Sequence, residues 1–466
     1  MTLSAGLALM LASVSGPTVV APAGAIEGVG QGGVKVFRGI PYAAPPVGAL
    51  RWRAPQPLAR WRGKRKAAAF GAICMQPPNA TDSGIGLEAP SEDCLTLSIW
   101  APAGPKRGLP VMVWLHGGGY TSGSGSAPLY DGRALAARGV VVVTLNYRLG
   151  RFGFFAHPGV PSGEGANFGL LDQRAALRWV RANIAAFGGD PTRVTLFGNS
   201  AGGESVLFHI SDRASHGLFA RAIVQSGLGG RALRTGATSV DADRAATPIE
   251  ALRALPASAI LGWGAPSLYR GFGPTIDGVT VRANIEAVFR ARRQAAVPLI
   301  IGYNSFEFPP AAMGGAGAAV ALVGHDFAER ARGAAAYGSV AAYEERIASD
   351  ALFRAPALRL AALHAAAGHP SWAYEFDVAA PAIVARFGGA PHASERAYVF
   401  GTLPRLGWPT DARDVEFARE LGDAWVAFAR GGAPWSRTSE PKLFTRATAP
   451  RTSDITPQLA DYLGLR

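Results

Sequence analysis

Six short apolar runs, separated by helical patterns, constrain the fold of this chain most strongly. They are rich in β-branched or aromatic residues and are bounded by Gly, Asn or Pro. Strands of a parallel sheet have this composition because helices cover both of their faces. We therefore predict buried parallel strands at residues 111–115, 140–145, 193–197, 221–225, 297–301 and 372–376.

Amphipathic helical patterns lie between these strands. From residue 172 to residue 187, the apolar positions Leu177, Val180, Ile184 and Phe187 share one helical face, and a similar spacing recurs between residues 418 and 428. Strands that alternate with helices indicate an α/β fold, with a doubly wound, mostly parallel sheet flanked by helices. A site in such a fold is expected at the carboxyl ends of the strands.

The 466 residues contain no linker-like stretch, so we expect one domain from residue 26 to residue 466. Residues 1–25 combine an apolar run with small residues, as a secretory signal does, although no Lys or Arg precedes Lys35. This pattern predicts a secreted or periplasmic protein. No later run approaches the ~18 apolar residues of a membrane span, so stable membrane insertion is not expected.

The formal net charge of +13 raises nucleic acid as a partner, but the basic residues are mostly arginines scattered singly. We therefore expect no nucleic-acid binding. Cys74 and Cys94 are the only two cysteines. They either form one disulfide in an oxidising compartment or remain two buried thiols, and a bridge would contribute about 3 kcal/mol.

The segment Gly198-Asn-Ser200-Ala-Gly202 follows a predicted strand and precedes a predicted helix. This is the context of a nucleophile elbow, in which a strained turn lifts a serine hydroxyl clear of the sheet. An ordinary glycine-rich turn has the same composition. The interpretation therefore depends on finding a base, an acid and an oxyanion site elsewhere in the chain.

A histidine must follow Ser200 and an acid in such a fold. His209 and His216 lie too few residues after Ser200, in a helix that leads away from it. Of the remaining candidates, His364 and His369 belong to what reads as a surface helix and its end, and His325 lies in a loop-like stretch. We favour His392, in a Gly/Pro loop after the strand at residues 372–376.

The acid should leave a strand end between Ser200 and His392. Glu307, which follows the strand at residues 297–301, meets this condition. Asp277 is the alternative, but its Asp-Gly sequence is typical of a turn. Glu307 would orient the imidazole of His392 and stabilise its charged form.

Three consecutive glycines follow the strand at residues 111–115, in His116-Gly117-Gly118-Gly119-Tyr120. Their bare backbone amides can converge on a developing oxyanion, and the amide of Ala201 can supply a further donor. Four separate pieces in the expected chain order are a specific combination.

At this point the chain resembles the type-B carboxylesterase family, the cholinesterase-like branch of the α/β-hydrolases, from about Pro17 to the C-terminal helix. The resemblance is carried by long strings: "VFRGIPYAAPPVGALRW", "SEDCLTLSIW", "VMVWLHGGGY", "NYRLGRFGFF" and "VTLFGNSAGG". It implies an α/β-hydrolase fold and hydrolysis of small to medium carboxylic esters through an acyl-enzyme. It implies no metal and no organic cofactor.

The resemblance also assigns roles residue by residue. It implies Ser200, Glu307 and His392 as the catalytic triad, with Gly118, Gly119 and Ala201 as oxyanion donors. It further implies a disulfide between Cys74 and Cys94, ion pairs Arg148–Asp172 and Arg51–Glu92, and a supporting role for Ser226 near the histidine loop.

Two departures from the family pattern bear on the substrate. Asn199 stands next to the nucleophile where the family often has Glu, so the site carries one fewer negative charge unless Glu204, one turn into the following helix, compensates. No Trp, Tyr or Phe lies between Cys74 and Cys94, so the ring that binds quaternary ammonium in cholinesterases is missing. Choline esters are therefore not expected as preferred substrates.

The sequence predicts the lining of the substrate pocket less well than it predicts the catalytic residues. Six aromatic residues either line an apolar cleft or pack in the core: Tyr120, Phe152, Phe154, Tyr303, Phe306 and Phe308. Alternatives on the same triad are a lipase, a lactone or carbamate hydrolase, and a toxin-ester hydrolase. A non-catalytic binding module of the same fold is a further alternative.

Overall fold

The computed structural model describes residues 16–77, 84–161, 163–235, 244–263, 272–310, 315–437, 440–446 and 456–465. Its centre is a ten-stranded sheet whose strands follow the order β15-β14-β13-β12-β11-β9-β10-β8-β4-β3. Neighbouring strands run parallel from β15 to β10 and antiparallel from β10 to β3. The strands are β3 (Val29–Gln31), β4 (Val34–Pro41), β8 (Thr96–Pro102), β9 (Leu109–Leu115), β10 (Val141–Leu145), β11 (Gly189–Asn199), β12 (Arg221–Gln225), β13 (Leu299–Asn304), β14 (Ser371–Asp377) and β15 (Lys442–Thr445).

All six predicted strands are present, in β9 to β14, and the mostly parallel, doubly wound sheet is confirmed. The antiparallel strands β3, β4 and β8 and the edge strand β15 were not predicted. The helical pattern at residues 172–187 corresponds to α3 (Phe168–Asn183) and a following 3₁₀ turn, and the C-terminal pattern corresponds to α15 (Ala412–Ala429).

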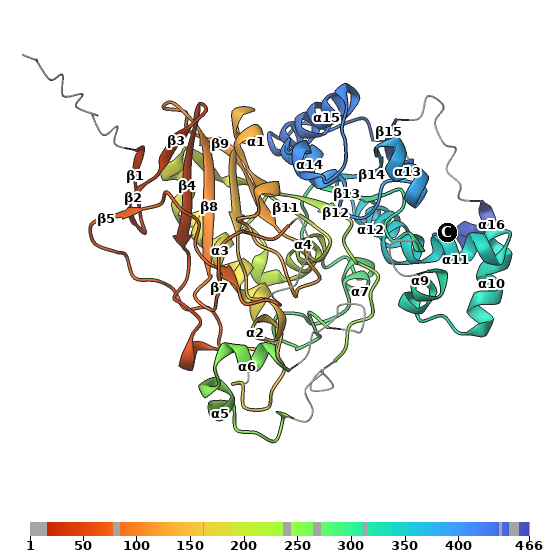
Figure 1. Ribbon diagram of the computed structural model, residues 1–466, viewed down its shortest axis with the longest axis horizontal. Coiled ribbons are helices and arrows are strands. Elements are labelled where there is room, and N and C mark those ends of the chain that lie inside the picture. Colours follow the sequence, from red (N-terminus) through yellow and green to blue (C-terminus); the bar gives the residue numbers. More distant parts are fainter. Residues whose placement is uncertain are drawn as a thin grey trace, which may run out of the picture.

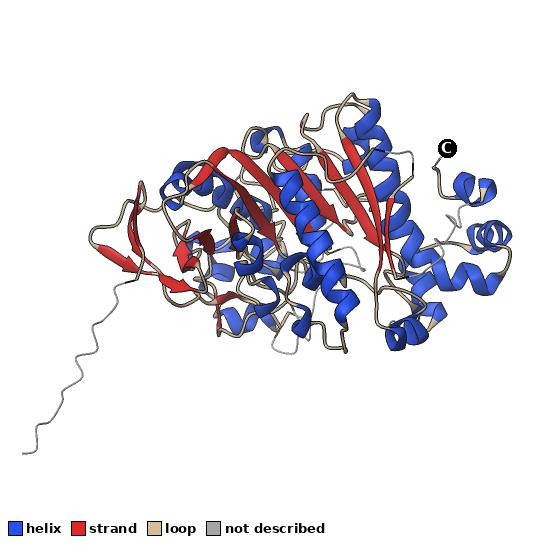
Figure 2. Cartoon of the chain, turned by 90° about the horizontal axis from the view of Figure 1, so that it is seen from above, coloured by secondary structure: helices blue, strands red, loops and turns tan. Residues whose placement is uncertain are grey.

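Helices cover both faces of the sheet (Figures 1 and 2). The face that packs against α14 and α15 also contacts α1, whereas α3, α4 and α12 pack on the other face. The helices other than α3 and α15 are α1 (Arg133–Ala137), α2 (Gly150–Gly153), α4 (Ala201–Ser211), α5 (Ile249–Ala254), α6 (Ala257–Leu261), α7 (Ile285–Arg290), α9 (Ala316–Val323), α10 (Phe327–Tyr337), α11 (Val340–Ser349), α12 (Ala355–Ala366), α13 (Pro381–Phe387), α14 (Glu395–Phe400) and α16 (Pro457–Tyr462).

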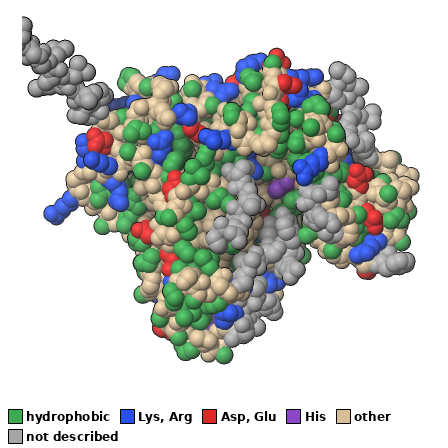
Figure 3. Space-filling model, viewed as in Figure 1, with side chains coloured by type: hydrophobic (Ala, Val, Ile, Leu, Met, Phe, Trp, Pro, Cys, Tyr) green, Lys and Arg blue, Asp and Glu red, His purple; other side chains and the backbone are tan. Residues whose placement is uncertain are grey.

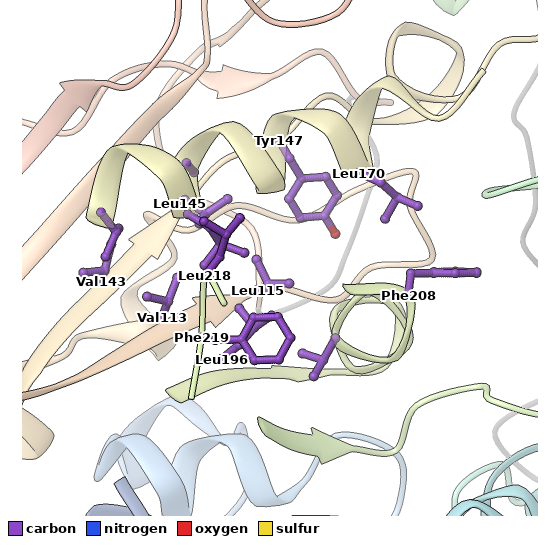
Figure 4. Packing of buried hydrophobic residues seen from close by; sticks show 14 of the residues in the cluster. Val113, Leu115, Val143, Leu145, Tyr147, Leu170, Leu196, Phe208, Leu218 and Phe219 are labelled. Atoms are coloured by element: carbon purple, nitrogen blue, oxygen red, sulfur yellow. The ribbon is translucent and has the colours of Figure 1, made fainter. Parts of the chain in front are cut away.

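Strand β9 shows why its sequence is apolar at every position. Val113 and Leu115 belong to the hydrophobic cluster on the α3/α4 face, whereas Met112 and Trp114 belong to the cluster on the α15 face. Successive side chains of a strand point to opposite faces, so a strand covered on both sides must be apolar throughout. Figure 4 shows the first cluster, in which Val113 and Leu115 meet residues of β10, β11 and α4.

The folded chain begins earlier than the boundary predicted after residue 25. Strand β1 (Thr18–Ala21) pairs antiparallel with β2 (Gly24–Glu27), which pairs in turn with β5 (Lys64–Lys66). These strands form a small three-stranded sheet beside the main one. The residues that carry most of the signal-like pattern, 1–15, lie outside the described part of the chain.

Cys74 and Cys94 form a disulfide, with a Cα–Cα distance of 5.0 Å. It joins the short strand pair β6 (Ile73–Cys74) and β7 (Pro90–Ser91) to the start of β8. Both implied ion pairs are also present. Arg148 contacts Asp172 at 2.7 Å, and Arg51 contacts Glu92 at 2.5 Å. Within the described residues, no helix combines the length and apolar character needed to cross a membrane.

Candidate active site

Ser200 occupies a strained turn between β11 and α4. Its backbone has φ 58° and ψ −124°, a conformation that residues other than glycine rarely adopt. The turn is held from both sides, because the Ser200 amide donates to Gln225 O at 2.9 Å and the Ser200 carbonyl accepts from the Glu204 amide at 2.8 Å. The serine hydroxyl is thereby presented at the N-terminus of α4, as the elbow motif predicts.

The flanking glycines are needed because backbones meet at this turn. A Cβ added at Gly202 would lie 2.0 Å from Leu115 O, and one added at Gly198 would lie 2.6 Å from the carbonyl of Gly202. Real Cβ atoms do not approach backbone so closely. The sequence Gly-x-Ser-x-Gly is therefore a packing requirement of the crossing between β9, β11 and α4.

Ser200, His392 and Glu307 form one hydrogen-bonded chain. His392 Nε2 lies 2.8 Å from Ser200 Oγ, and His392 Nδ1 lies 2.6 Å from Glu307 Oε2. An Nδ1–H that donates to the carboxylate leaves Nε2 free of a proton, so Nε2 accepts from the serine hydroxyl. The structure thus brings together three residues that are far apart in the sequence.

Glu307 is fixed by the backbone around it. Its side chain is fully buried, and its Oε1 accepts from the amide of Asn304 at 2.7 Å. Its backbone carbonyl accepts from the amide of His392 at 3.0 Å. Both oxygens of the carboxylate therefore accept a hydrogen bond, and together these bonds orient the acid toward the imidazole.

The ring of His392 lies between two phenylalanines. The centroid of Phe308 is 5.0 Å and that of Phe353 is 4.9 Å from the imidazole centroid. The histidine side chain keeps 18% of its surface exposed. Phe353 was not predicted, and its place in a helical stretch gave no signal that it would meet His392.

The loop that carries His392 is attached to the residues just after β13. Asn304 Nδ2 donates to Pro391 O at 3.1 Å, and the Ala390 amide donates to Ser305 Oγ at 2.9 Å. The predicted support from the Ser226 side chain is not found. Its buried hydroxyl has no hydrogen-bond partner among the described residues, although its amide donates to Gly302 O at 2.8 Å.

Asn199, beside the nucleophile, contacts a second buried carboxylate. Its Nδ2 donates to Glu395 Oε1 at 2.9 Å, and Glu395 starts α14 directly after the histidine loop. Burial, with the negative charge of Glu307 nearby, raises the pKa of Glu395. Sequence reasoning missed Glu395, although an acid three residues after a candidate histidine is a usable signal.

Glu204 does not supply the charge that Asn199 lacks. Its carboxylate is fully buried and forms an ion pair with Arg231, with both contacts at 3.2 Å. The charge of Glu204 is thereby neutralised locally, one turn into α4. Glu395, which accepts from Asn199, is therefore a second carboxylate beside the one that Glu307 contributes to the hydrogen-bonded chain.

The glycine loop after β9 lies against Ser200. A Cβ added at Gly117 would be 3.1 Å from Ser200 Cβ, and Gly118 and Gly119 both have positive φ, 104° and 61°. Among the described residues, the amides of Gly118, Gly119 and Ala201 donate no hydrogen bond to another protein group. Donors left free beside a nucleophile are what an oxyanion site needs.

The alternatives considered for acid and base have structural roles. Asp277 Oδ1 accepts from the amides of Val279, Thr280 and Val281, as a turn-forming aspartate does. His364 is fully buried, contrary to the surface-helix interpretation, and its Nε2 lies 2.7 Å from Val297 O. His325 lies within 3.0 Å of the Tyr343 hydroxyl.

Five of the six aromatic residues proposed for a cleft are packed in the interior: Tyr120, Phe152, Phe154, Tyr303 and Phe306. Phe308 is the exception, because it contacts the His392 ring directly. Within the described residues, no group of three or more His, Cys, Asp or Glu is arranged to hold a metal ion.

The sheet topology and the strand-to-helix serine define an α/β-hydrolase, in which Ser, acid and His follow one another along the chain. Comparison with known proteins narrows the class. The model of the carboxylesterase family matches residues 15–321 and 332–458, so the chain belongs to the carboxylesterase family. It is a serine carboxylic ester hydrolase.

Individual relatives agree with this assignment. Fumonisin B1 esterase of Sphingopyxis macrogoltabida is 38% identical over 88% of this chain and 81% of its own length. Para-nitrobenzyl esterase of Bacillus subtilis (strain 168) is 37% identical over 88% of this chain and 89% of its own. A solved structure of a PNB esterase is 36% identical, with a TM-score of 0.77 over 90% of this chain and 91% of the other.

Proposed function

We propose that Ser200 is the nucleophile of this esterase, His392 its general base and Glu307 the residue that orients the imidazole. The observation that carries the proposal is the hydrogen-bonded chain from Ser200 Oγ through both ring nitrogens of His392 to Glu307. A serine hydroxyl is a weak nucleophile until a base accepts its proton. The buried carboxylate stabilises the imidazolium that results.

The reaction then proceeds in two halves. His392 takes the hydroxyl proton as Ser200 Oγ bonds to the ester carbonyl carbon, and the proton passes to the leaving alcohol as the acyl-enzyme forms. Water enters, gives a proton to His392 and bonds to the acyl carbon. The acid leaves as Ser200 recovers its proton.

Negative charge develops on the carbonyl oxygen in both halves. We propose that the amides of Gly118, Gly119 and Ala201 bind this oxygen, because they lie beside Ser200 and have no protein partner among the described residues. Such donors act on the transition state more than on the ground state, and the loss of one typically costs about 10²–10³ in rate.

For the substrate we propose small to medium carboxylic esters with alkyl or aryl alcohols. The missing aromatic residue between Cys74 and Cys94 argues against choline esters. Lipase, lactone, carbamate and toxin-ester hydrolysis remain alternatives on the same triad. The relatives named for fumonisin B1 and for para-nitrobenzyl esters provide the first compounds to try.

The test of the site is covalent labelling with an organophosphate probe. Wild-type protein should take up one phosphoryl group, located on Ser200 by mass spectrometry of its peptides. Ser200→Ala should take up none. A protein that remains unlabelled while folded would contradict the proposal and favour a non-catalytic module. A panel of esters that varies acyl length and leaving group then defines the substrate class.

We also propose that the protein is exported, and that residues from β1 onward form one catalytic domain. The disulfide supports an oxidising compartment, since cytosolic thiols are kept reduced. Expression of the full chain with separation of periplasm, medium and cytosol tests this. Recovery of intact residues 1–15 on cytosolic protein with free thiols would contradict it.

A further inference from the structure

Gln76 is a buried side chain that binds the backbone of the glycine loop, residues 116–126. Its Oε1 accepts from the Gly123 amide at 2.9 Å, and its Nε2 donates to Gly123 O at 3.1 Å. Gln76 is only 4% exposed, and its Nε2 also donates to Cys74 O at 3.0 Å. Because both polar groups of one side chain bind both polar groups of one backbone unit, Gln76 fixes the place and the orientation of Gly123.

The segment that carries Gln76 is itself fixed. Gln76 lies two residues after Cys74, whose disulfide ties strand β6 to the start of β8. Asn146, just after β10, donates from its Nδ2 to Ala72 O at 3.0 Å, and its Oδ1 accepts from the Gly125 amide at 2.8 Å. A side chain anchored in this way can position a loop, whereas one on a free segment would only follow it.

Gly123 packs directly against the peptide that carries the Gly118 amide. A Cβ added at Gly123 would lie 2.5 Å from both Gly117 O and His116 Nδ1. His116 Nδ1 lies 2.9 Å from Gly117 O, and its N–H donates because a carbonyl can only accept. The carbonyl of Gly117 and the amide of Gly118 belong to one planar trans peptide and point in opposite directions. Fixing Gly117 O therefore fixes the direction of the Gly118 N–H.

The next peptide of the loop is fixed in the same way. Gly118 O accepts from the amides of Thr121 and Ser122, both at 3.0 Å, which closes a tight turn just before Gly123. Because Gly118 O points into this turn, the Gly119 amide on the same planar peptide points out of it. A shift of Gly123 would therefore disturb both peptides that carry the glycine donors.

We propose that Gln76 is a positioning residue for ester hydrolysis. Through Gly123 it holds the amides of Gly118 and Gly119 toward the oxygen on which negative charge develops, a role that rests on the proposed function. Donors of this kind act on the transition state, and their effect depends on their placement before the reaction. Loosening them should therefore lower kcat and leave KM nearly unchanged.

The test replaces Gln76 with methionine in the full chain. Gln76→Met nearly keeps the length of the side chain and removes both hydrogen bonds to Gly123. We expect kcat for an aryl butyrate to fall about 30-fold, less than for the outright loss of a donor, and KM to change less than about twofold. Titration of the active sites with an organophosphate gives the rate per reactive molecule.

An aryl trifluoromethyl ketone measures the oxyanion site separately. Ser200 Oγ adds to its carbonyl carbon, His392 takes the hydroxyl proton, and the carbonyl oxygen becomes an oxyanion. Because this adduct uses the same amides as the transition state, its inhibition constant should rise by the factor by which kcat/KM falls. A residue that only supports the fold would lower the unfolding temperature without this parallel.

Asn183→Leu is the matched control. Asn183, at the end of α3, is also 4% exposed, accepts from the Ala23 amide and donates to Trp179 O, both at 2.8 Å. The control should lower the unfolding temperature as Gln76→Met does and leave kcat unchanged. Neither substitution alters a charge, so the Lys, Arg, Asp and Glu side chains spread over the surface in Figure 3 are the same in both variants.

A folded Gln76→Met protein with the kcat of the wild type, or an equal loss of kcat in Asn183→Leu, would overturn the proposal. So would a higher KM with unchanged kcat, because Gln76 would then act on substrate binding. If Gln76→Met does not fold, Gln76→Glu takes its place, since it keeps an acceptor for the Gly123 amide but sets an oxygen against Gly123 O. It should lower kcat and weaken the ketone together, and wild-type values would overturn the proposal.

The outcome also separates this inference from the proposed function. Ester hydrolysis that survives Ser200→Ala would refute the proposed function itself. A wild type that is labelled on Ser200 and hydrolyses esters, with a Gln76→Met variant that is equally active, would refute only the role of Gln76.

Discussion

The two sides of the candidate active site are built differently. The Ser200 side, from β9 to β12, depends on the backbone. It has a strained turn, glycines where strands and helix cross, and amides that have no protein partner within the described residues. The His392 side, from β13 to α14, depends on contacts between distant segments, with a fixed carboxylate and a ring packed between Phe308 and Phe353. Local sequence determines the first side, and tertiary packing determines the second.

If the two sides act as one catalytic unit, removing either should be as damaging as removing both. We expect Ser200→Ala and His392→Ala each to lower kcat by about 10⁴-fold or more, and the double variant to fall little further. Kinetics on one activated aryl ester measures this, with circular dichroism confirming the fold. Effects that multiply in the double variant would show that the two residues act independently.

The substitution Gly118→Ala should disturb the Ser200 side of the site and leave the His392 side unchanged. The added Cβ would lie 2.2 Å from Ser122 O, so the loop and its free amide must move. We expect kcat/KM to fall by about 10²–10³, the effect of one lost oxyanion donor.

Gly104→Ala is the matched control for that variant. Gly104 also has positive φ, 90°, but a Cβ there meets nothing within 4 Å. It should cost stability only, through backbone strain. Equal losses of activity in the two variants would mean that strain, rather than a displaced donor, is responsible.

The His392 side alone is loosened by Phe353→Leu. A smaller, non-planar side chain leaves the imidazole room to tilt away from Ser200, and we expect kcat to fall about 30-fold. Phe289→Leu is the control, because Phe289 is equally buried but packs against His364 instead. Thermal unfolding should shift similarly in both variants. A similar decrease in kcat for the control would show that the Phe353 ring has no particular role in positioning His392.

The same contrast explains what the sequence could predict. The elbow and the glycine loop could be predicted from the sequence. The strained turn and the crossing backbones require small residues, and these residues are adjacent in the chain. Glu307 and His392 were reached by chain order and elimination, and their contact was expected from the roles that such a triad requires, which the resemblance then matched. Glu395 was missed although its place three residues after His392 was a usable signal. The contact of Phe353 with His392, and the Ser226 hydroxyl that has no partner among the described residues, could not be predicted, because the neighbours of these side chains come from other elements.

The fold divides in a similar way. Parallel strands covered on both faces are apolar throughout and were found. Strand β8 has the sequence Thr-Leu-Ser-Ile-Trp-Ala-Pro, and β4 carries Lys35, Arg38 and a glycine within its eight residues. Their register with neighbours, including the shift between Phe37 and Ile40, depends on tertiary pairing that single-sequence periodicity does not contain.

The smallest expected effect concerns stability in acid, because each side contains a buried histidine whose pKa is lowered. Burial lowers the pKa of His209, in α4, to about 4, and burial likewise lowers the pKa of His364, in α12, to about 4. Free histidine titrates near 6.5. Between the pKa of free histidine and the lowered pKa, the unfolded chain binds a proton at this histidine and the folded chain does not. The free energy of unfolding therefore decreases as the pH decreases.

The free energy of unfolding of the wild type should decrease from pH 7.5 to pH 6. We expect this decrease to be about 1 kcal/mol smaller in His209→Gln and in His364→Gln. Urea unfolding at both pH values measures it. The free energy of unfolding of each variant at pH 7.5 measures the effect of the substitution on packing, and this effect is subtracted from the value at pH 6. His209 contacts Gln173 and Ser215 and lies near two charged groups. Asp212 favours its protonation, and Arg174 opposes it. Its share should therefore depend on salt more than that of His364, and equal salt dependence would show that desolvation alone keeps both rings neutral.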